Sequence, residues 1–224
     1  MKYLGGKSRI AKEIVKFLES ERINNQMYIE PFIGSCAIFE KMNSPKKGGD
    51  ISKDLIYMWK AIQDGWIPPK EVEEIEYNKI KNEQPSALRG FIGFGCSWGG
   101  KFFGGYAREN SDRNFALNAH NQVLKTRNGI YDALIQLGDY TQFSSEIDSL
   151  IYCDIPYKNT TKYSMNFDYG AFYDWAIKMS KNNKIFISEY AMPDEFIEVY
   201  SIERNLELKS NNQARRIEKI FTVK

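Results

Sequence analysis

The chain has 224 residues, 42% of them apolar and 27% charged, and its formal net charge is +2. This size and composition are typical of a compact soluble protein with one core, and they leave room for a small insert. No apolar run reaches the length of a membrane span, and the N-terminal MKYLGGKSRIAKE lacks the apolar stretch of a signal peptide, so we expect a cytoplasmic protein without a membrane partner. The three cysteines are far apart and there is a single histidine, which predicts free thiols and no metal site.

The N-terminal third alternates between helix and strand patterns. Apolar residues recur at helical spacing over Ser8–Leu18, and Met27–Phe32 is typical of a short strand. Ile33–Met42 then predicts a glycine turn that opens a helix, and Lys46–Ser52 predicts a second strand ending at Asp50. Strand, turn, helix and strand in this order indicate a βαβ unit.

The middle of the chain does not continue this alternation. Gly65–Lys81 predicts a loop and a helix, Arg89–Arg108 holds seven glycines and predicts irregular structure, and Ala116–Leu137 predicts a helix. We therefore expect an inserted subdomain over residues 66–137, on a core made of residues 1–65 and 138–224.

The C-terminal part returns to alternating elements. Strand patterns occur over Ser149–Tyr157, Lys184–Tyr190 and Arg216–Val223, with a helix pattern over Tyr169–Ser180 and a short helix expected after Pro193. These strands and those of the N-terminal third predict one mostly parallel sheet in an α/β fold.

Marked residues follow three of the predicted strands: EPFIGSC, Asp50 and DIPY. Ligands of open α/β sheets bind beyond the carboxyl ends of the strands, and a carboxylate after the second strand of a βαβ unit commonly binds a ribose. Asp50 therefore has two readings, as a ribose ligand or as the N-cap of a helix over Ile51–Asp64. The two roles are compatible.

The N-terminal KYLGGKSR also has two readings. Its glycines allow the backbone to approach a ligand, Tyr3 offers a ring face and Lys7 a cation, but a flexible N-terminal arm has the same composition. No GxGxxG or Walker-type phosphate loop is present, which disfavours a phosphate-dependent cofactor.

In their order along the chain, KYLGGKSR, YIEPFIGSCAIFEK, GDISKDLI, LGDY, IYCDIPY and FISEYAMPDEF resemble the Dam-like DNA adenine methyltransferases, especially their short phage-borne members. The resemblance covers essentially the whole chain. It implies a Rossmann-like S-adenosylmethionine-dependent methyltransferase fold, with helices on both faces of the sheet and a mainly helical DNA-recognition insert. The implied activity is transfer of a methyl group from S-adenosylmethionine to the exocyclic amino group of a flipped adenine in duplex DNA, in a bacterial or phage-infected cell.

The resemblance also implies roles for individual residues. The catalytic DPPY-type motif corresponds to Asp154, Ile155, Pro156 and Tyr157. The implied cofactor contacts are Tyr3, Lys7, Glu30, Pro31, Phe32, Gly34, Asp50, Asp139, Tyr140 and Asp154.

The implied catalytic motif suits the chemistry of an adenine amine. The nitrogen lone pair is delocalised into the ring, so an acceptor carboxylate and a backbone carbonyl that hold its two hydrogens localise the pair. Asp154 would supply the carboxylate and Ile155 the carbonyl, while Pro156 would fix the turn. Tyr157 would stack on the base after it leaves the duplex.

Two positions depart from the family pattern. The motif usually contains two prolines, where this chain has DIPY, and Cys36 stands where the glycine turn should end in a small residue. One alternative is therefore a degenerate relative that binds DNA or S-adenosylmethionine without methyl transfer. Another is an enzyme that methylates RNA or a free base.

The local charge changes sign within the chain. Asp50–Glu83 has eight acids and five bases, whereas Pro85–Gly129 has six bases and two acids. Basic and aromatic residues among glycines suit a loop that binds phosphates and presses a ring between bases. The predicted DNA contacts are Trp98, Lys101, Phe102, Tyr106, Arg108 and Arg113. The alternative is a loop held against the core by its aromatic rings.

Glu189 and Tyr190 are further candidates for the target-base pocket.

Overall fold

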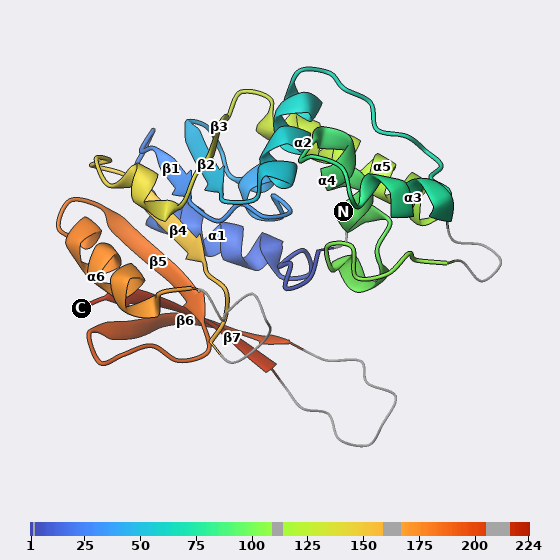
Figure 1. Ribbon diagram of the computed structural model, residues 1–224. Coiled ribbons are helices and arrows are strands. Elements are labelled where there is room, and N and C mark those ends of the chain that lie inside the picture. The colour runs from blue at the N-terminus through green and yellow to red at the C-terminus, as the bar shows by residue number, and fades with distance from the viewer. Residues whose placement is uncertain (2, 109–113, 159–166, 205–215) are drawn as a thin grey trace.

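The computed structural model describes residues 1–224 except 2, 109–113, 159–166 and 205–215 (Figure 1). The strands are β1 (Tyr28–Glu30), β2 (Lys46–Asp50), β3 (Leu134–Leu137), β4 (Leu150–Asp154), β5 (Lys184–Glu189), β6 (Phe196–Arg204) and β7 (Arg216–Val223). The helices are α1 (Ala11–Glu21), α2 (Lys53–Gln63), α3 (Glu74–Ile80), α4 (Ala87–Gly95), α5 (Phe115–Ile130) and α6 (Tyr169–Ser180).

These strands form one seven-stranded sheet in the order β3-β2-β1-β4-β5-β7-β6. The first five strands of this order are parallel, whereas β7 runs antiparallel to both β5 and β6. This mostly parallel arrangement confirms the predicted fold class, a Rossmann-like α/β fold.

Alternate strand residues face opposite sides of the sheet, as the period of two in a strand requires. One side packs against α1, α2, α4 and α5 and includes Tyr28, Tyr152, Phe186 and Ile220. The other side packs against α6 and includes Ile29, Ile151, Cys153, Ile187 and Phe221. Helices therefore cover both faces, and in Figure 1 α3, α4 and α5 gather beside α2 at the opposite end of the molecule from α6.

Two glycines of β2 are required by close packing on both faces of the sheet. A Cβ atom on Gly48 would lie 2.6 Å from Ile33 Cγ2, and one on Gly49 would lie 2.9 Å from the ring of Phe143. Since real Cβ contacts are never this short, both faces of β2 are filled by neighbouring side chains.

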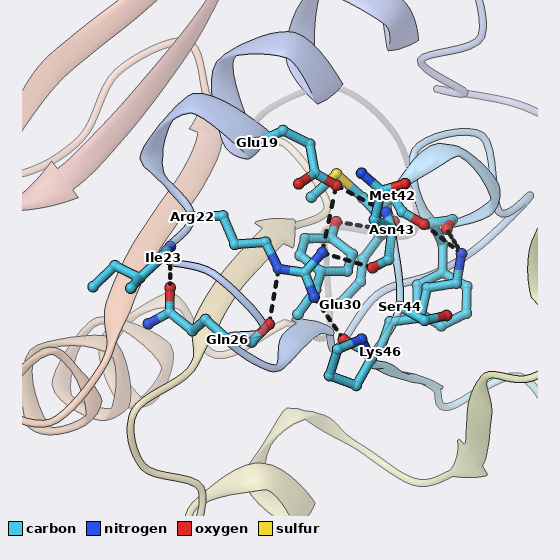
Figure 2. Close-up of polar contacts among 12 residues, drawn as sticks. Glu19, Arg22, Ile23, Gln26, Glu30, Met42, Asn43, Ser44 and Lys46 are labelled. Carbon is cyan, nitrogen blue, oxygen red and sulfur yellow. Dashed lines mark hydrogen bonds and ion pairs between the residues drawn. The ribbon is translucent and has the colours of Figure 1, made fainter.

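A buried arginine fixes the end of α1 to the chain that leads into β2 (Figure 2). The Arg22 side chain is only 5% exposed, and its Nε donates to Gln26 O at 2.8 Å. Its two terminal nitrogens donate to Asn43 O at 2.6 Å and Pro45 O at 2.8 Å. Because charged hydrogen bonds are stronger than neutral ones, these contacts hold the starts of β1 and β2 in register.

Four predicted elements differ from the structure. Ile33–Met42 contains only a short 3-10 turn (Phe39–Lys41), because the chain must reach β2 within a few residues. The start of the predicted irregular segment forms α4. No helix follows Pro193 within the described residues, where β6 begins at Phe196 instead.

The fourth difference concerns the end of the predicted insert. Helix α5 ends at Ile130, and Leu134–Leu137 forms β3, which pairs in parallel with β2. The last residues of the range 66–137 therefore belong to the sheet. Val72, Phe91, Ile92 and Val123 also join the same buried cluster as α1 and α2, so the helices of this range are packed onto the core.

Candidate active site

The carboxyl ends of β1 and β4 lie side by side at the point where the chain changes direction through the sheet. From β1, one neighbouring strand is β2 and the other is β4, so successive connections run to opposite sides. In open α/β sheets this switch point is where ligands bind. The strands end here in Glu30, Asp50 and Asp154, which the sequence analysis singled out.

Asp50 joins the end of β2 to the glycine turn after β1. Its Oδ2 accepts from Gly34 N at 3.0 Å and its Oδ1 accepts from Ser52 N at 2.8 Å. Burial raises the pKa of this carboxyl, and the backbone hydrogen bonds oppose that effect. Ser52, not Asp50, is the N-cap of α2, since its hydroxyl accepts from Leu55 N. The reading of Asp50 as the helix cap is therefore wrong.

The glycine turn adopts a backbone that favours glycine at two positions. Gly34 has a φ of 43° and Cys36 a φ of 59°, so Cys36 bears the strain of a left-handed conformation in a side chain that is fully buried. The Tyr3 ring lies over Gly34, where a Cβ atom would be 3.1 Å from the ring. The structure thus brings together Tyr3, Gly34 and Asp50, three of the predicted cofactor contacts.

Lys7 binds the predicted catalytic aspartate. Its Nζ lies 2.6 Å from Asp154 Oδ1, and the two side chains are 4% and 22% exposed. The sequence analysis assigned Lys7 to the cofactor, whereas its direct contact is with Asp154. A buried ammonium requires such a partner, because its desolvation is otherwise costly.

Neighbouring side chains bind the backbone of the DIPY segment at Pro156 and of the next residue, Lys158. Tyr169 Oη donates to Pro156 O at 2.8 Å. Glu189, at the end of β5, accepts from Lys158 N at 3.1 Å and from Tyr190 N at 2.7 Å. The Ile155 side chain is buried on the α6 side of the sheet. These contacts hold the backbone on both sides of Tyr157 next to the end of β4.

Glu218 of β7 is part of this site, and the sequence analysis missed it. It accepts a hydrogen bond from Tyr157 Oη, and its Oε1 lies 3.4 Å from Lys7 Nζ. The ammonium also lies 4.5 Å from the centre of the Tyr157 ring. A sequence signal was present, because a carboxylate two residues before the fully buried Ile220 falls on the buried face of the strand.

The remaining predicted cofactor residues are Glu30, Pro31, Phe32, Asp139 and Tyr140. Phe32 stacks on Tyr140 with ring centres 5.9 Å apart, so the structure brings these two together. Asp139 is exposed and caps the 3-10 turn Tyr140–Phe143 by accepting from Thr141 N at 2.8 Å. Glu30 is buried and accepts from Tyr28 Oη at 2.7 Å, and burial raises its pKa well above the usual range. Pro31 is also buried.

The predicted DNA contacts differ in exposure. Trp98 is 69% exposed, and Lys101 is also exposed. Arg108 is exposed and forms an ion pair with Glu74, in which its Nε donates at 2.9 Å. Phe102 instead packs on Phe94 with ring centres 4.6 Å apart.

Tyr106 also packs inward, and its hydroxyl donates to Val72 O at 2.7 Å. The packing of Phe102 and Tyr106 matches the alternative of a loop held to the core by its aromatic rings. Arg113 lies outside the described residues.

Over the described residues, no group of three or more His, Cys, Asp or Glu side chains is placed to hold a metal ion. Nor does any helix there have both the length and the apolar character to span a membrane.

Comparisons with known proteins support the family resemblance. A sequence model of the D12 class N6 adenine-specific DNA methyltransferases matches residues 3–93. No curated protein matched the chain. Among solved structures, the rRNA methyltransferase aviRa from Streptomyces viridochromogenes is 10% identical with a TM-score of 0.47, and the similarity covers 99% of this chain and 86% of that one.

TrmN from Thermus thermophilus is 9% identical with a TM-score of 0.45, over 98% of this chain and 49% of that one. At these identities and TM-scores neither structure bears on function. The family match spans Tyr3, Lys7, the glycine turn and Asp50, and it confirms the resemblance of this chain to the Dam-like DNA adenine methyltransferases.

Proposed function

We propose that this protein transfers a methyl group from S-adenosylmethionine to the exocyclic amino group of an adenine in duplex DNA. The observation that carries the proposal is the DIPY loop, held at the switch point of the sheet with Asp154 paired to Lys7. The match to adenine-specific DNA methyltransferases over residues 3–93 supports the substrate class.

The residues at the ends of β1 and β2 fit a nucleoside cofactor. Asp50 is half-buried and fixed by two amide donors, and each of its oxygens keeps a further lone pair for a ribose hydroxyl. Gly34 has no side chain, so its backbone allows a ligand to approach beside the Tyr3 ring. S-adenosylmethionine supplies an electrophilic methyl group when bound.

The chain's own residues would prepare the adenine for this transfer. Asp154 Oδ1 accepts from Lys7, which leaves Oδ2 to accept one hydrogen of the amino group. The Ile155 carbonyl would accept the other hydrogen, so that the nitrogen lone pair is localised. Tyr157 offers its ring to the flipped base. Since Ile155 acts through its backbone, the missing proline of the motif does not remove the acceptor.

The test is incubation of the purified protein with labelled S-adenosylmethionine and mixed-sequence duplex DNA, followed by identification of the modified nucleoside. We expect N6-methyladenine in DNA, and none in matched RNA. Asp154→Ala should abolish transfer while the protein still folds and largely retains its affinity for duplex DNA, measured by fluorescence anisotropy. Asp174→Ala is the matched control, since Asp174 is an exposed carboxylate on α6 and should not affect the rate.

Results other than N6-methyladenine in DNA would indicate a different function. Binding of DNA or cofactor without transfer by the wild type would indicate a degenerate relative, and recovery of transfer by Ile155→Pro would assign the loss to the changed motif. Methylation of RNA alone would overturn the DNA substrate. Equal rates for Asp154→Ala and wild type would overturn the catalytic role of Asp154.

A further inference from the structure

The direction of β7 places its first residues at the same edge of the sheet as the DIPY loop. β7 is antiparallel to β5, with Glu189 opposite Lys219 and Ser188 opposite Ile220. Glu189 is the last residue of β5, so Glu218 lies just beyond the carboxyl end of that strand. An antiparallel strand thus brings a side chain from near the C-terminus to an edge otherwise formed by strand ends.

Glu218 makes its contacts where the proposed chemistry takes place. Its carboxylate is 1% exposed and accepts from the Tyr157 hydroxyl. Lys7 Nζ lies between two carboxylates, 2.6 Å from Asp154 and 3.4 Å from Glu218. Three segments that are far apart in sequence therefore meet: the N-terminal motif, the DIPY loop and β7.

A buried carboxylate is a poor choice for stability alone. Its desolvation is costly, and replacing a buried charged network by apolar residues is often neutral or stabilising. The contacts of Glu218 instead restrict one degree of freedom of the site, the direction of the Tyr157 ring. A ring that is free to rotate away would lose part of its stacking on a flipped base, because positioning contributes directly to the rate.

From this geometry we infer that Glu218 is a positioning residue for methyl transfer, which holds the Tyr157 ring in place through the phenolic hydroxyl. The inference rests on the proposed function and extends it to β7. Lys7 compensates the charge of Glu218 and links the same carboxylate to Asp154.

The test is a double-mutant cycle in the rate of methyl transfer at saturating cofactor and DNA. Glu218→Ala and Tyr157→Phe remove the same hydrogen bond, so each should lower the rate about tenfold and the double variant should be no more than about threefold below the slower single variant. If the rate of the double variant is about a hundredfold below wild type, the two single losses are independent and the inference is overturned. An unchanged rate in Glu218→Ala would also overturn it. Cofactor affinity should stay within about twofold of wild type in all three variants.

Two further variants separate positioning from folding. Glu218→Gln keeps the size of the side chain and an oxygen that accepts from Tyr157, so it should recover most of the rate lost in Glu218→Ala. Failure of this rescue in a folded protein would contradict the hydrogen-bond role. Glu198→Ala is the matched control, because Glu198 of the adjacent β6 forms a surface ion pair with Lys219 and should leave the rate unchanged.

A readout that does not need activity distinguishes this inference from the proposed function. With 3-fluorotyrosine at position 157, Glu218→Ala should move the fluorine resonance toward its position in the unfolded protein, and Glu198→Ala should not. If both variants leave it unmoved, Glu218 does not hold the ring. If the wild type transfers no methyl group, the proposed function fails, whereas the resonance still decides whether Glu218 positions Tyr157.

Discussion

Three glutamates at the carboxyl edge of the sheet are buried near the ammonium group of Lys7. Burial raises the pKa of Glu30, Glu189 and Glu218, and the nearby Lys7 opposes the effect for all three. Burial disfavours a charged carboxylate, while an opposite charge favours it. The edge is therefore an acidic cluster whose charge state depends on Lys7.

Glu218 gives this cluster a measurable pH dependence. Burial raises its pKa from 4.5 to about 7, so the folded state binds the proton more tightly than the unfolded state. The resulting stabilisation is complete below about pH 4.5 and is lost as the pH rises to about 7, which amounts to roughly 3 kcal/mol. Urea unfolding across this range should show the wild-type free energy of unfolding falling relative to Glu218→Gln. Parallel curves would contradict the shifted pKa.

The three thiols provide a second prediction at the residue scale. Cys36, Cys96 and Cys153 are all buried, and burial raises the pKa of Cys96 to about 12 and those of the other two well above the usual range. Because the thiolate is the reactive form, none should react with a disulfide reagent at pH 8 until the protein unfolds. Reaction in guanidinium gives the control value of three thiols. Rapid labelling of the native protein would show that the glycine turn, the end of α4 or β4 opens.

The sequence predicted the residues of the site better than their partners. Strand ends could be located from the sequence, so Asp50 and Asp154 were placed at the ends of β2 and β4, where the structure has them. The ion pair between Lys7 and Asp154 was not predicted. Glu218 was missed because its place depends on the antiparallel direction of β7. Local patterns carry no information on strand direction, which depends on long-range pairing.

At the scale of the element, close helix packing explains why α4 was predicted as irregular. Glycine is the poorest helix former after proline, and α4 contains three glycines. A Cβ atom on Gly90 would lie 2.3 Å from Asp54 O of α2, and one on Gly93 would lie 2.3 Å from the Phe102 ring. Glycine is thus required by the approach of neighbours, and tertiary packing overrides local propensity.

A matched pair of substitutions tests this explanation. Gly90→Ala gains about 1 kcal/mol in helix propensity but drives a methyl group into the α2 backbone, so we expect a net loss of about 1 to 3 kcal/mol. Gly170→Ala in α6 meets only Asp168 Oδ1 at 3.4 Å, and it should be neutral or stabilising. Thermal unfolding of both variants measures the difference. A stabilised Gly90→Ala would show that α2 and α4 can separate at little cost.

Strands were easier to predict than the connections between them. β2, β4, β5 and β7 were each located within a few residues. β4, β5 and β7 contain apolar or β-branched runs, whereas β2 is KKGGD and was located only as the segment that ends at Asp50. β6 was mistaken for a helix because FIEVY also fits helical spacing, and its strand state depends on pairing with β7. β3 was absorbed into α5 because its residues continue a helical pattern that stops only where the sheet begins.

At the scale of the whole molecule, the predicted insert and the site are in direct contact. Leu4 N donates to Gly100 O at 3.1 Å, and the Tyr3 ring lies 5.2 Å from that of Phe94. The loop that presents Trp98 and Lys101 is therefore attached to the segment that carries Tyr3 and Lys7. This arrangement places a predicted DNA-contact surface next to the predicted cofactor contacts, although the division between core and insert stays a prediction.

Removing a positive charge and removing a negative charge from this surface should change DNA affinity in opposite directions. Arg108 is held by Glu74 in an exposed pair, and such a pair contributes little to stability. If Arg108 binds a phosphate, Arg108→Ala should weaken binding to mixed-sequence duplex DNA and reduce the slope of log affinity against log salt by about 0.9. Lys101→Ala should do the same. Glu74→Gln should instead strengthen binding, because it releases the guanidinium from its carboxylate.

Glu73→Gln separates this effect from net charge, since it removes the same charge from an exposed neighbour of Glu74. Both variants reduce the repulsion of DNA, but only Glu74→Gln frees Arg108. Its gain in affinity should therefore be the larger of the two, and in an Arg108→Ala background it should fall to the gain of Glu73→Gln. Fluorescence anisotropy at several salt concentrations measures all five variants. Equal gains in Glu73→Gln and Glu74→Gln, with an unchanged salt slope in Arg108→Ala, would mean that Arg108 serves only the surface pair with α3 and that DNA binds elsewhere.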